Sequence, residues 1–152
     1  RAARQKGRRQ AREKARALDA RRWVLPVADY RLTGTFGEAS SLWSSTHTGL
    51  DFATSYGSDI RAVAAGTVTD AGWDGSYGYR TVVTLPDGTE LWYAHQSRIL
   101  VGTGDHIARG EVIGEVGSTG NSTGPHVHLE VRPHGAEPVD PQDALVDHGA
   151  RP

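Results

Sequence analysis

Two histidines stand one residue apart in the segment GPHVHLEV, residues 124–131. Side chains alternate between the faces of an extended strand, so His126, His128 and Glu130 share one face and the apolar residues share the other. A core can take the apolar face, but two adjacent imidazoles cannot both be charged without a large free-energy penalty. The pattern indicates that both surround a metal ion, or that one is a ligand and the other an acid–base group.

A metal ion needs further ligands, and the segment HTGLD, residues 47–51, offers them. If this segment is extended, His47 and Asp51 lie on one face, and Gly49 between them leaves room for a bound ion. With one of the two later histidines they supply two nitrogen ligands and one oxygen ligand. Three protein ligands and an open position are typical of a catalytic zinc site.

A third segment, LWYAHQ at residues 91–96, has the composition of a strand and carries His95. Strict alternation places His95 on the same face as Leu91 and Tyr93, with Trp92 on the opposite face. We therefore expect three strand-like segments, each directing His or Asp side chains to one side.

The elements that must position these residues are short strands separated by turns. The runs GTVTDAGW, RTVVTL, TELWYAH, EVIGEVG and HVHLEV are typical of strands, and glycines recur between them. The segment LPDGTE predicts a hairpin turn, because Pro86 fixes φ and Asp87 with Gly88 tolerates positive φ. Without long helical patterns between the strands, we expect a mainly antiparallel β fold.

The charge distribution divides the chain near Arg22. Residues 1–22 contain ten basic and two acidic side chains, a net charge of +8, whereas residues 23–152 carry −9. The first segment is rich in helix formers, but Leu18 is its only large apolar residue before Trp23. A solvated basic helical extension or linker is favoured over an arm that binds an anionic polymer. No nucleic-acid partner is expected, because neither a recognition element nor interleaved aromatic residues follow.

Several classes are excluded by what the sequence lacks. The chain has no cysteine, so it has no disulfide and no thiolate metal site. It has no apolar run of about 18 residues and no signal-peptide core, so any export signal is expected upstream of Arg1. No His-Glu-x-x-His helix is present, which excludes thermolysin-type zinc chemistry.

The order of the motifs resembles that of the lysostaphin-type, or LytM-type, zinc peptidases. The resemblance rests on His-x-x-x-Asp, then Tyr-x-His, then GSTGNSTGPHVHLEV at residues 117–131, with HTGLDFA, VAAGTV, VGTGDHIARGEVIG and PVDP in support. It covers about residues 34–143. It implies a small, twisted, two-layer antiparallel β-sheet domain over residues 23–152, with a zinc ion in an open groove.

The resemblance also assigns roles to residues. It implies that His47, Asp51 and His128 bind one Zn2+ per chain, and that His95 and His126 flank the attacking water. Which of these two takes the proton and which stabilises the oxyanion stays open. The implied activity is that of a zinc metalloendopeptidase, secreted or in the cell envelope, that hydrolyses cross-bridge or stem peptides of bacterial peptidoglycan.

Two other functions stay open. A catalytically silent module of the same fold would bind peptidoglycan or activate another hydrolase, although all five chemical residues are present. A zinc carboxypeptidase acting on D-alanyl ends would need a group that captures the terminal carboxylate, and the sequence nominates none. The oligomeric state is not predicted.

Some neighbouring residues have two interpretations. Glu130 either accepts a hydrogen bond from a histidine ring or joins a surface salt bridge. Trp43, Trp73, Trp92 and Tyr77 are either core aromatics or walls of a substrate groove, and the core is favoured for Trp92.

Overall fold

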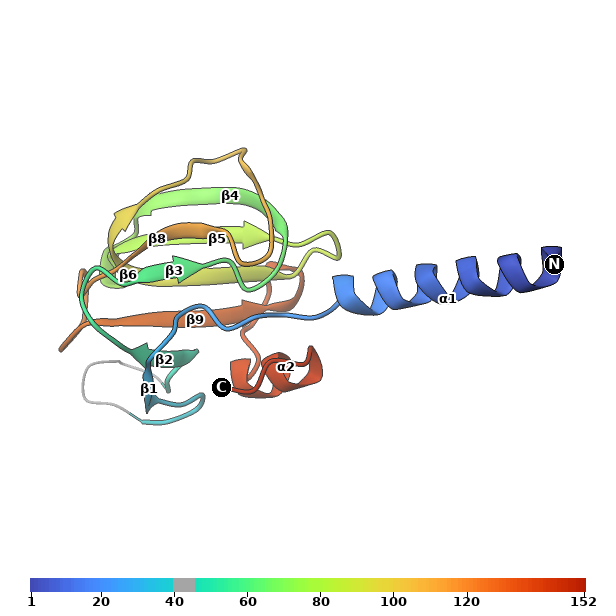
Figure 1. The fold of residues 1–152 in the computed structure, drawn as a ribbon. Helices are drawn as coiled ribbons and strands as arrows, with labels where there is room; N and C mark the ends of the chain where they lie inside the picture. Colours follow the sequence, from blue (N-terminus) through green and yellow to red (C-terminus); the bar gives the residue numbers. More distant parts are fainter. Residues whose placement is uncertain (40–45) are drawn as a thin grey trace.

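The computed structural model describes residues 1–39 and 46–152, which form a β-sheet body with a long projecting helix (Figure 1). The strands of the described residues are β1 (Arg31–Gly34), β2 (Leu50–Ala53), β3 (Asp59–Arg61), β4 (Gly66–Trp73), β5 (Tyr79–Thr84), β6 (Glu90–Ile99), β7 (His106–Ile107), β8 (Val112–Val116) and β9 (His126–Arg132). The helices are α1 (Ala2–Ala20) and α2 (Pro141–Asp147), with short 3-10 turns η1 (Gly75–Tyr77) and η2 (Pro133–Gly135).

The strands form one antiparallel sheet in the order β1-β2-β9-β6-β5-β4-β7. The long strand β6 pairs with β9 over Glu90–Ala94 and with β8 over Gln96–Ile99, and β8 also pairs with β3. β3 and β8 thereby contribute Ile60 and Ile113 to the same core as the main sheet. The prediction of a mainly β, antiparallel fold with an N-terminal helix is confirmed.

The core lies against one face of β9. Val127, Leu129 and Val131 alternate along this strand and are buried with Tyr93 of β6, whose hydroxyl accepts a hydrogen bond from the Val63 amide at 2.9 Å. Burial stabilises each large apolar side chain by roughly 1.5–3 kcal/mol. The apolar face therefore holds β9 in place, and the opposite face of the strand remains for polar groups.

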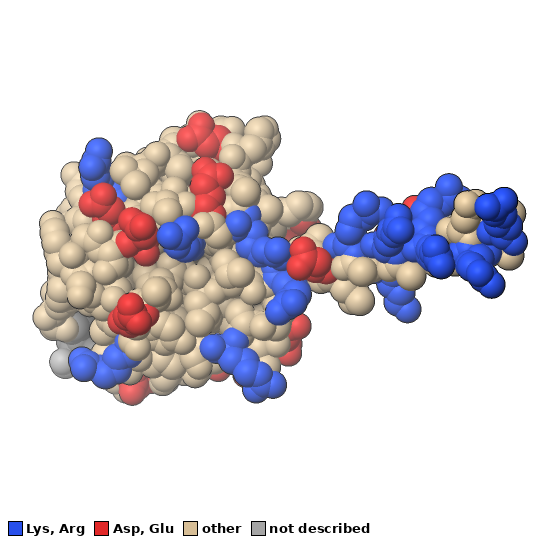
Figure 2. All heavy atoms as spheres, viewed as in Figure 1, with Lys and Arg blue, Asp and Glu red and all other residues tan. Residues whose placement is uncertain are grey.

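α1 projects from the body, and none of its residues is buried (Figures 1 and 2). Its C-terminal end is held where the Arg109 guanidinium donates to the carbonyls of Asp19 and Arg22. The Trp23 ring stacks on His148, with ring centroids 4.0 Å apart. The division into an extension and a folded domain at residue 22 stays a prediction. Among the helices of the described residues, none has the length and apolar character that crossing a membrane requires.

Candidate metal centre and catalytic site

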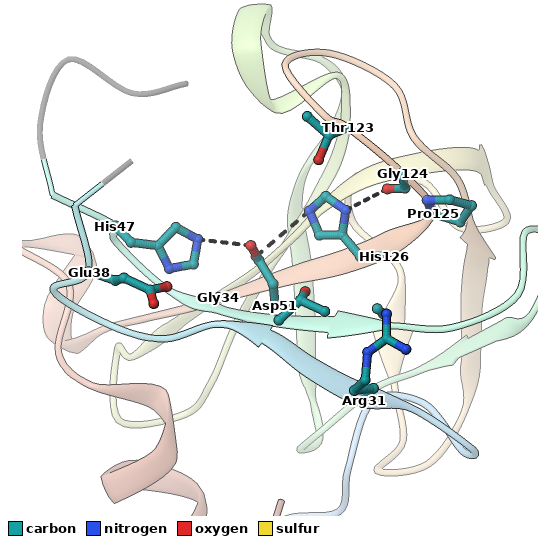
Figure 3. A pocket seen from close by; sticks show the side chains of 11 residues that line it. Arg31, Gly34, Glu38, His47, Asp51, Thr123, Gly124, Pro125 and His126 are labelled. Carbon is teal, nitrogen blue, oxygen red and sulfur yellow. Dashed lines mark hydrogen bonds and ion pairs between the residues drawn. The ribbon is translucent and has the colours of Figure 1, made fainter. Parts of the chain in front are cut away.

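The pairing of β2 with β9 brings two distant motifs together. Asp51 lies opposite His128, and Ala53 lies opposite His126. Opposed residues of antiparallel strands project to the same face, so the Asp51 carboxylate meets both imidazoles on the face turned away from the core. His47 precedes β2 and turns its ring toward the same carboxylate (Figure 3).

His47, Asp51 and His128 form a cluster that can hold a metal ion. One potential ligand atom from each lies within 4.8 Å of the others. His47 Nε2 is 3.1 Å from Asp51 Oδ2, and His128 Nδ1 is 2.7 Å from Asp51 Oδ1. Both histidines are buried, whereas Asp51 is partly exposed. The donor set suits a divalent cation such as zinc.

The outer nitrogen of each of these histidines bonds to an acceptor. His47 Nδ1 donates to the Thr35 carbonyl at 3.0 Å, and His128 Nε2 donates to Glu130 Oε2 at 2.8 Å. A carbonyl or an ionised carboxylate can only accept, so these nitrogens carry the protons. The other nitrogen of each ring, Nε2 of His47 and Nδ1 of His128, faces Asp51. Outer hydrogen bonds of this kind orient histidine ligands in metal sites, so the residues present fit a metal ion.

The charges of the cluster depend on one another. Burial alone would raise the pKa of Asp51, but hydrogen bonds with His128 and His47 outweigh it and hold that pKa well below its usual range. Burial alone would lower the pKa of His128, but hydrogen bonds with Asp51 and Glu130 raise it to about 9. A metal cation would therefore compete with a proton on His128.

Two glycines let the cluster close. A Cβ on Gly49 would overlap the Leu129 carbonyl and lie 2.8 Å from His128 Cε1. The His128 ring thus takes the space beside Gly49, and the expectation that this space is left for an ion was wrong. A Cβ on Gly34 of β1 would lie 2.6 Å from Asp51 Oδ2. At Gly49 a side chain would meet backbone, and at Gly34 it would displace the Asp51 carboxylate, so glycine at both positions lets the ligands approach.

His126 lies beside the cluster. Its Nδ1 is 2.8 Å from the Gly124 carbonyl and 3.3 Å from Ser122 Oγ. The carbonyl fixes the proton on Nδ1, and Nε2 lies 3.7 Å from Asp51 Oδ1 (Figure 3). The basic nitrogen of His126 therefore faces the candidate metal position.

His95 reaches the site through an irregularity in β6. Its φ is +61°, and the register of β6 on β5 shifts by one residue between the pairs Thr81–Tyr93 and Tyr79–Gln96. This bulge turns His95 away from the core face, where Tyr93 lies, so the expectation that the two share a face was wrong. The positive φ is uncommon for a non-glycine residue.

In this position His95 packs against the other histidines. Its ring centroid lies 4.8 Å from that of His126 and 5.9 Å from that of His128. Its Nδ1 donates to the Thr119 carbonyl at 2.6 Å. Burial and the neighbouring His126 lower the pKa of His95 to about 4. His95 is therefore neutral at pH 7, and its basic nitrogen is Nε2.

Glu130 is the buried anchor of His128. Besides the His128 ring it accepts hydrogen bonds from Thr48 Oγ1 (2.5 Å), Tyr77 Oη (2.8 Å) and Arg132 Nε (2.7 Å). Burial alone would raise its pKa, but the hydrogen bond with His128 and the other bonds lower it to about 2. Of the two interpretations, the acceptor for a histidine ring is confirmed, since Glu130 is fully buried.

The aromatic residues are placed around this network. Trp92 lies outside the core cluster, between two guanidinium groups. The Cζ atom of Arg80 is 4.3 Å from the Trp92 ring centroid, and that of Arg132 is 3.9 Å from it. The preference for a core position was therefore wrong, because β6 turns Trp92 to the same side as Glu130. Trp73 is exposed. Trp43 lies outside the described residues.

The site opens into a pocket of about 430 Å³ (Figure 3). Its lining comes from the β1 and β2 strands, the segment around Glu38 and the loop before β9, and comprises Arg31, Thr33, Gly34, Glu38, His47, Asp51, Ala53, Thr123, Gly124, Pro125 and His126. A peptide entering it would meet both the candidate ligands and the His126 ring.

Sequence reasoning missed several supporting residues. The sequence carries a signal for two of them. Thr48 directly follows the predicted ligand His47. Arg132 follows Glu130 at the spacing that shares a strand face. Tyr77, which the sequence placed either in the core or on a groove wall, instead donates its hydroxyl to Glu130, because a 3-10 turn far away in sequence brings it there.

The fold and the site define an antiparallel β-sheet domain with a His-Asp-His candidate metal centre, as in a metal-dependent hydrolase. Residues 45–141 match Peptidase family M23, and the chain belongs to this family. The resemblance that the motifs indicated is confirmed.

Relatives were found by sequence and by structure. The chain is 46% identical over 121 residues to DD-carboxypeptidase/endopeptidase Mpg from Neisseria meningitidis, a match that covers 78% of this chain and 28% of that protein. It thus spans little more than a quarter of that relative's length. The catalytic domain of the antimicrobial peptidase lysostaphin from Staphylococcus simulans superposes with a TM-score of 0.72 and 30% identity, covering 78% of this chain and 93% of the domain.

A structure of a different kind is also similar. A chain of the SpoIIQ–SpoIIIAH pore forming complex gives a TM-score of 0.72 at 27% identity, covering 82% of this chain and 90% of that chain. The fold therefore also occurs in an assembly, and the residues of the site must decide between the functions.

Proposed function

We propose that this chain is a zinc metalloendopeptidase that hydrolyses peptide bonds in bacterial peptidoglycan, as a secreted or cell-envelope protein. The observation that carries the proposal is the convergence of His47, Asp51 and His128 within 4.8 Å of one another beside two further histidines. The antimicrobial peptidase lysostaphin and the peptidase Mpg support the reaction class.

The three clustered residues would hold one zinc ion through His47 Nε2, an Asp51 oxygen and His128 Nδ1. When bound, zinc polarises a scissile carbonyl and lowers the pKa of a water molecule toward about 7. His47 and His128 are oriented for this role by the hydrogen bonds of their outer nitrogens.

His95 and His126 would move the protons. With Nδ1 bonded to the Thr119 carbonyl, a neutral His95 presents only a lone pair at Nε2, so it suits the general base that accepts the proton of the attacking water. His126, when protonated at Nε2, can donate to the developing oxyanion or to the leaving amine. The two backbone carbonyls fix the same tautomer in both rings, so the assignment depends on the burial of His95, which keeps that ring neutral.

A DD-carboxypeptidase activity is the second candidate, and the 46% identity to Mpg, whose name includes it, favours it. Mass spectrometry of digested peptidoglycan separates the two activities. Cleaved cross-links indicate an endopeptidase, whereas free D-alanine indicates a carboxypeptidase.

The proposal is tested with metal analysis and peptidoglycan digestion of matched variants. We expect the wild type to bind one zinc and to release fragments, His126→Ala to keep the metal but lose turnover, and His128→Ala to lose both. His106→Ala, an exposed histidine on β7, is the control and should match the wild type. A zinc-loaded wild type that releases nothing from peptidoglycan would instead support a silent binding or activating module.

A further inference from the structure

The cationic side chain of Arg31 lies in the same cross-strand row of the sheet as His126. In the ladder of β1, β2 and β9, Arg31 lies opposite Ala53, and Ala53 lies opposite His126. Neighbouring strands are about 4.8 Å apart, so the Arg31 backbone is about 10 Å from that of His126, with only a methyl side chain between them. The adjacent row contains Gly34, Asp51 and His128.

The Arg31 guanidinium points from β1 into the site pocket (Figure 3). Its side chain is exposed, and among the described residues no hydrogen bond or ion pair occupies its guanidinium. The nearby Asp51 carboxylate is bonded to histidines. An arginine that none of the described residues neutralises, at the edge of a pocket that also holds His126, is available to an anion.

We infer that Arg31 binds a free carboxylate on the substrate residue whose amine is released by cleavage. The inference rests on the proposed function and names its substrate class. A guanidinium binds a carboxylate through two parallel N–H···O bonds, which fixes orientation as well as charge. This group is the carboxylate-binding residue that a carboxypeptidase needs.

Two peptidoglycan structures supply such a carboxylate. One is a stem peptide that ends in D-alanyl-D-alanine, in which the released alanine carries the terminal carboxylate. The other is a D-alanyl cross-link to an amine whose own carbon bears a free carboxylate, as in diaminopimelate. A bond between two residues of a glycine bridge has no carboxylate at that position, so Arg31 selects against it.

The surroundings of Arg31 accommodate both. A second hollow of about 470 Å³ shares Arg31, Ala53 and Pro125 with the site pocket and continues to Tyr30 and Ser55. A released alanine would end at Arg31, whereas the rest of a cross-linked stem would continue into this second hollow. One arginine therefore serves an endopeptidase and a carboxypeptidase reaction.

The test compares matched substrates on the zinc-loaded full chain. D-alanyl-D-alanine pentapeptide is assayed as the free acid and as the C-terminal amide, and a diaminopimelate cross-linked dimer is assayed with that carboxylate free and amidated. We expect the wild type to prefer each free acid by about ten- to a hundredfold in kcat/KM, mainly through KM, as for loss of a hydrogen bond to a charged group.

Arg31→Ala should abolish this preference, because kcat/KM on the free acids falls toward that on the amides, and Arg31→Lys should restore part of it. Arg98→Ala, an exposed arginine paired with Glu115 on β8, is the control and should keep the full preference. If only the pentapeptide is cleaved faster as the free acid, Arg31 binds the terminal carboxylate. If only the dimer is, Arg31 binds the carboxylate beside the cross-link. Cleavage of acids and amides at equal rates by the wild type, or an unchanged preference in Arg31→Ala, overturns the inference while the proposed function stands. No cleavage of any peptidoglycan peptide overturns the proposed function itself.

Discussion

Replacing Glu130 by glutamine tests how the buried network supports the metal centre. Glu130 is fully buried and accepts bonds from His128, Thr48, Tyr77 and Arg132. Glutamine keeps the shape but removes the charge and adds an NH2 group, which faces donors rather than acceptors. The amide has one acceptor oxygen in place of two, so it cannot accept from both the His128 ring and Arg132, and the Arg132 guanidinium loses its counterion.

Two magnitudes follow for Glu130→Gln. Loss of an outer hydrogen-bond partner of a metal ligand weakens metal binding by about 10- to 100-fold, or about 1.4–2.7 kcal/mol. For the metal-free chain, the network lowers the Glu130 pKa from 4.5 to about 2, which corresponds to about 3 kcal/mol of stabilisation of the ionised group. We expect the variant to lose stability of that order at pH 7.

Zinc affinity is measured by competition with a chromophoric chelator, and stability by urea unfolding of the metal-free chain. Glu137→Gln makes the same change on an exposed residue and should have neither effect. Wild-type zinc affinity and stability in Glu130→Gln would refute the idea that Glu130 holds His128 in place.

Three further predictions concern the pH dependence, the core and the approach of the ligands. The pKa of His128 in the folded chain, about 9, lies above its unfolded value of 6.5, because hydrogen bonds with carboxylates outweigh burial. The charged ring therefore stabilises the folded, metal-free chain below pH 6.5. This stabilisation, about 3 kcal/mol, should be lost as the pH rises through 9. Urea unfolding at pH 6 and pH 10 measures this, and equal stability at both contradicts it. Leu129→Ala empties a fully buried core position and should destabilise the chain by about 2–5 kcal/mol in the same assay; a loss below about 1 kcal/mol would show that the core is not packed there. Gly34→Ala places a methyl group against Asp51 and should weaken zinc binding about tenfold or more. The control Gly7→Ala, on the exposed helix α1, should leave zinc affinity unchanged. Unchanged zinc affinity in Gly34→Ala would count against the ligand geometry.

Much of the site follows from local sequence patterns. Alternation in HVHLEV correctly separates a core face from a polar face, because β9 is regular and is held by apolar packing on one side. His47 and Asp51 are close in sequence, so a short turn into β2 suffices to bring them together.

The parts that sequence could not predict depend on tertiary pairing. His95 changes face because β6 contains one residue more than β5 at that point, and no local pattern marks this bulge. Tyr77 reaches the site through the 3-10 turn η1, and Arg31 reaches it through the pairing of β1 with β2. The space beside Gly49 is filled by the His128 ring, which only the register of β2 on β9 determines.

We expect one metal ion to bind between β2 and β9. Crystals of the zinc-loaded chain, with diffraction data collected on both sides of the zinc absorption edge, test it most directly. We expect one anomalous peak per chain, at about 2.0–2.2 Å from His47 Nε2, an Asp51 oxygen and His128 Nδ1. A fully occupied peak held by other residues, or no peak at these three atoms in zinc-saturated crystals, would contradict it.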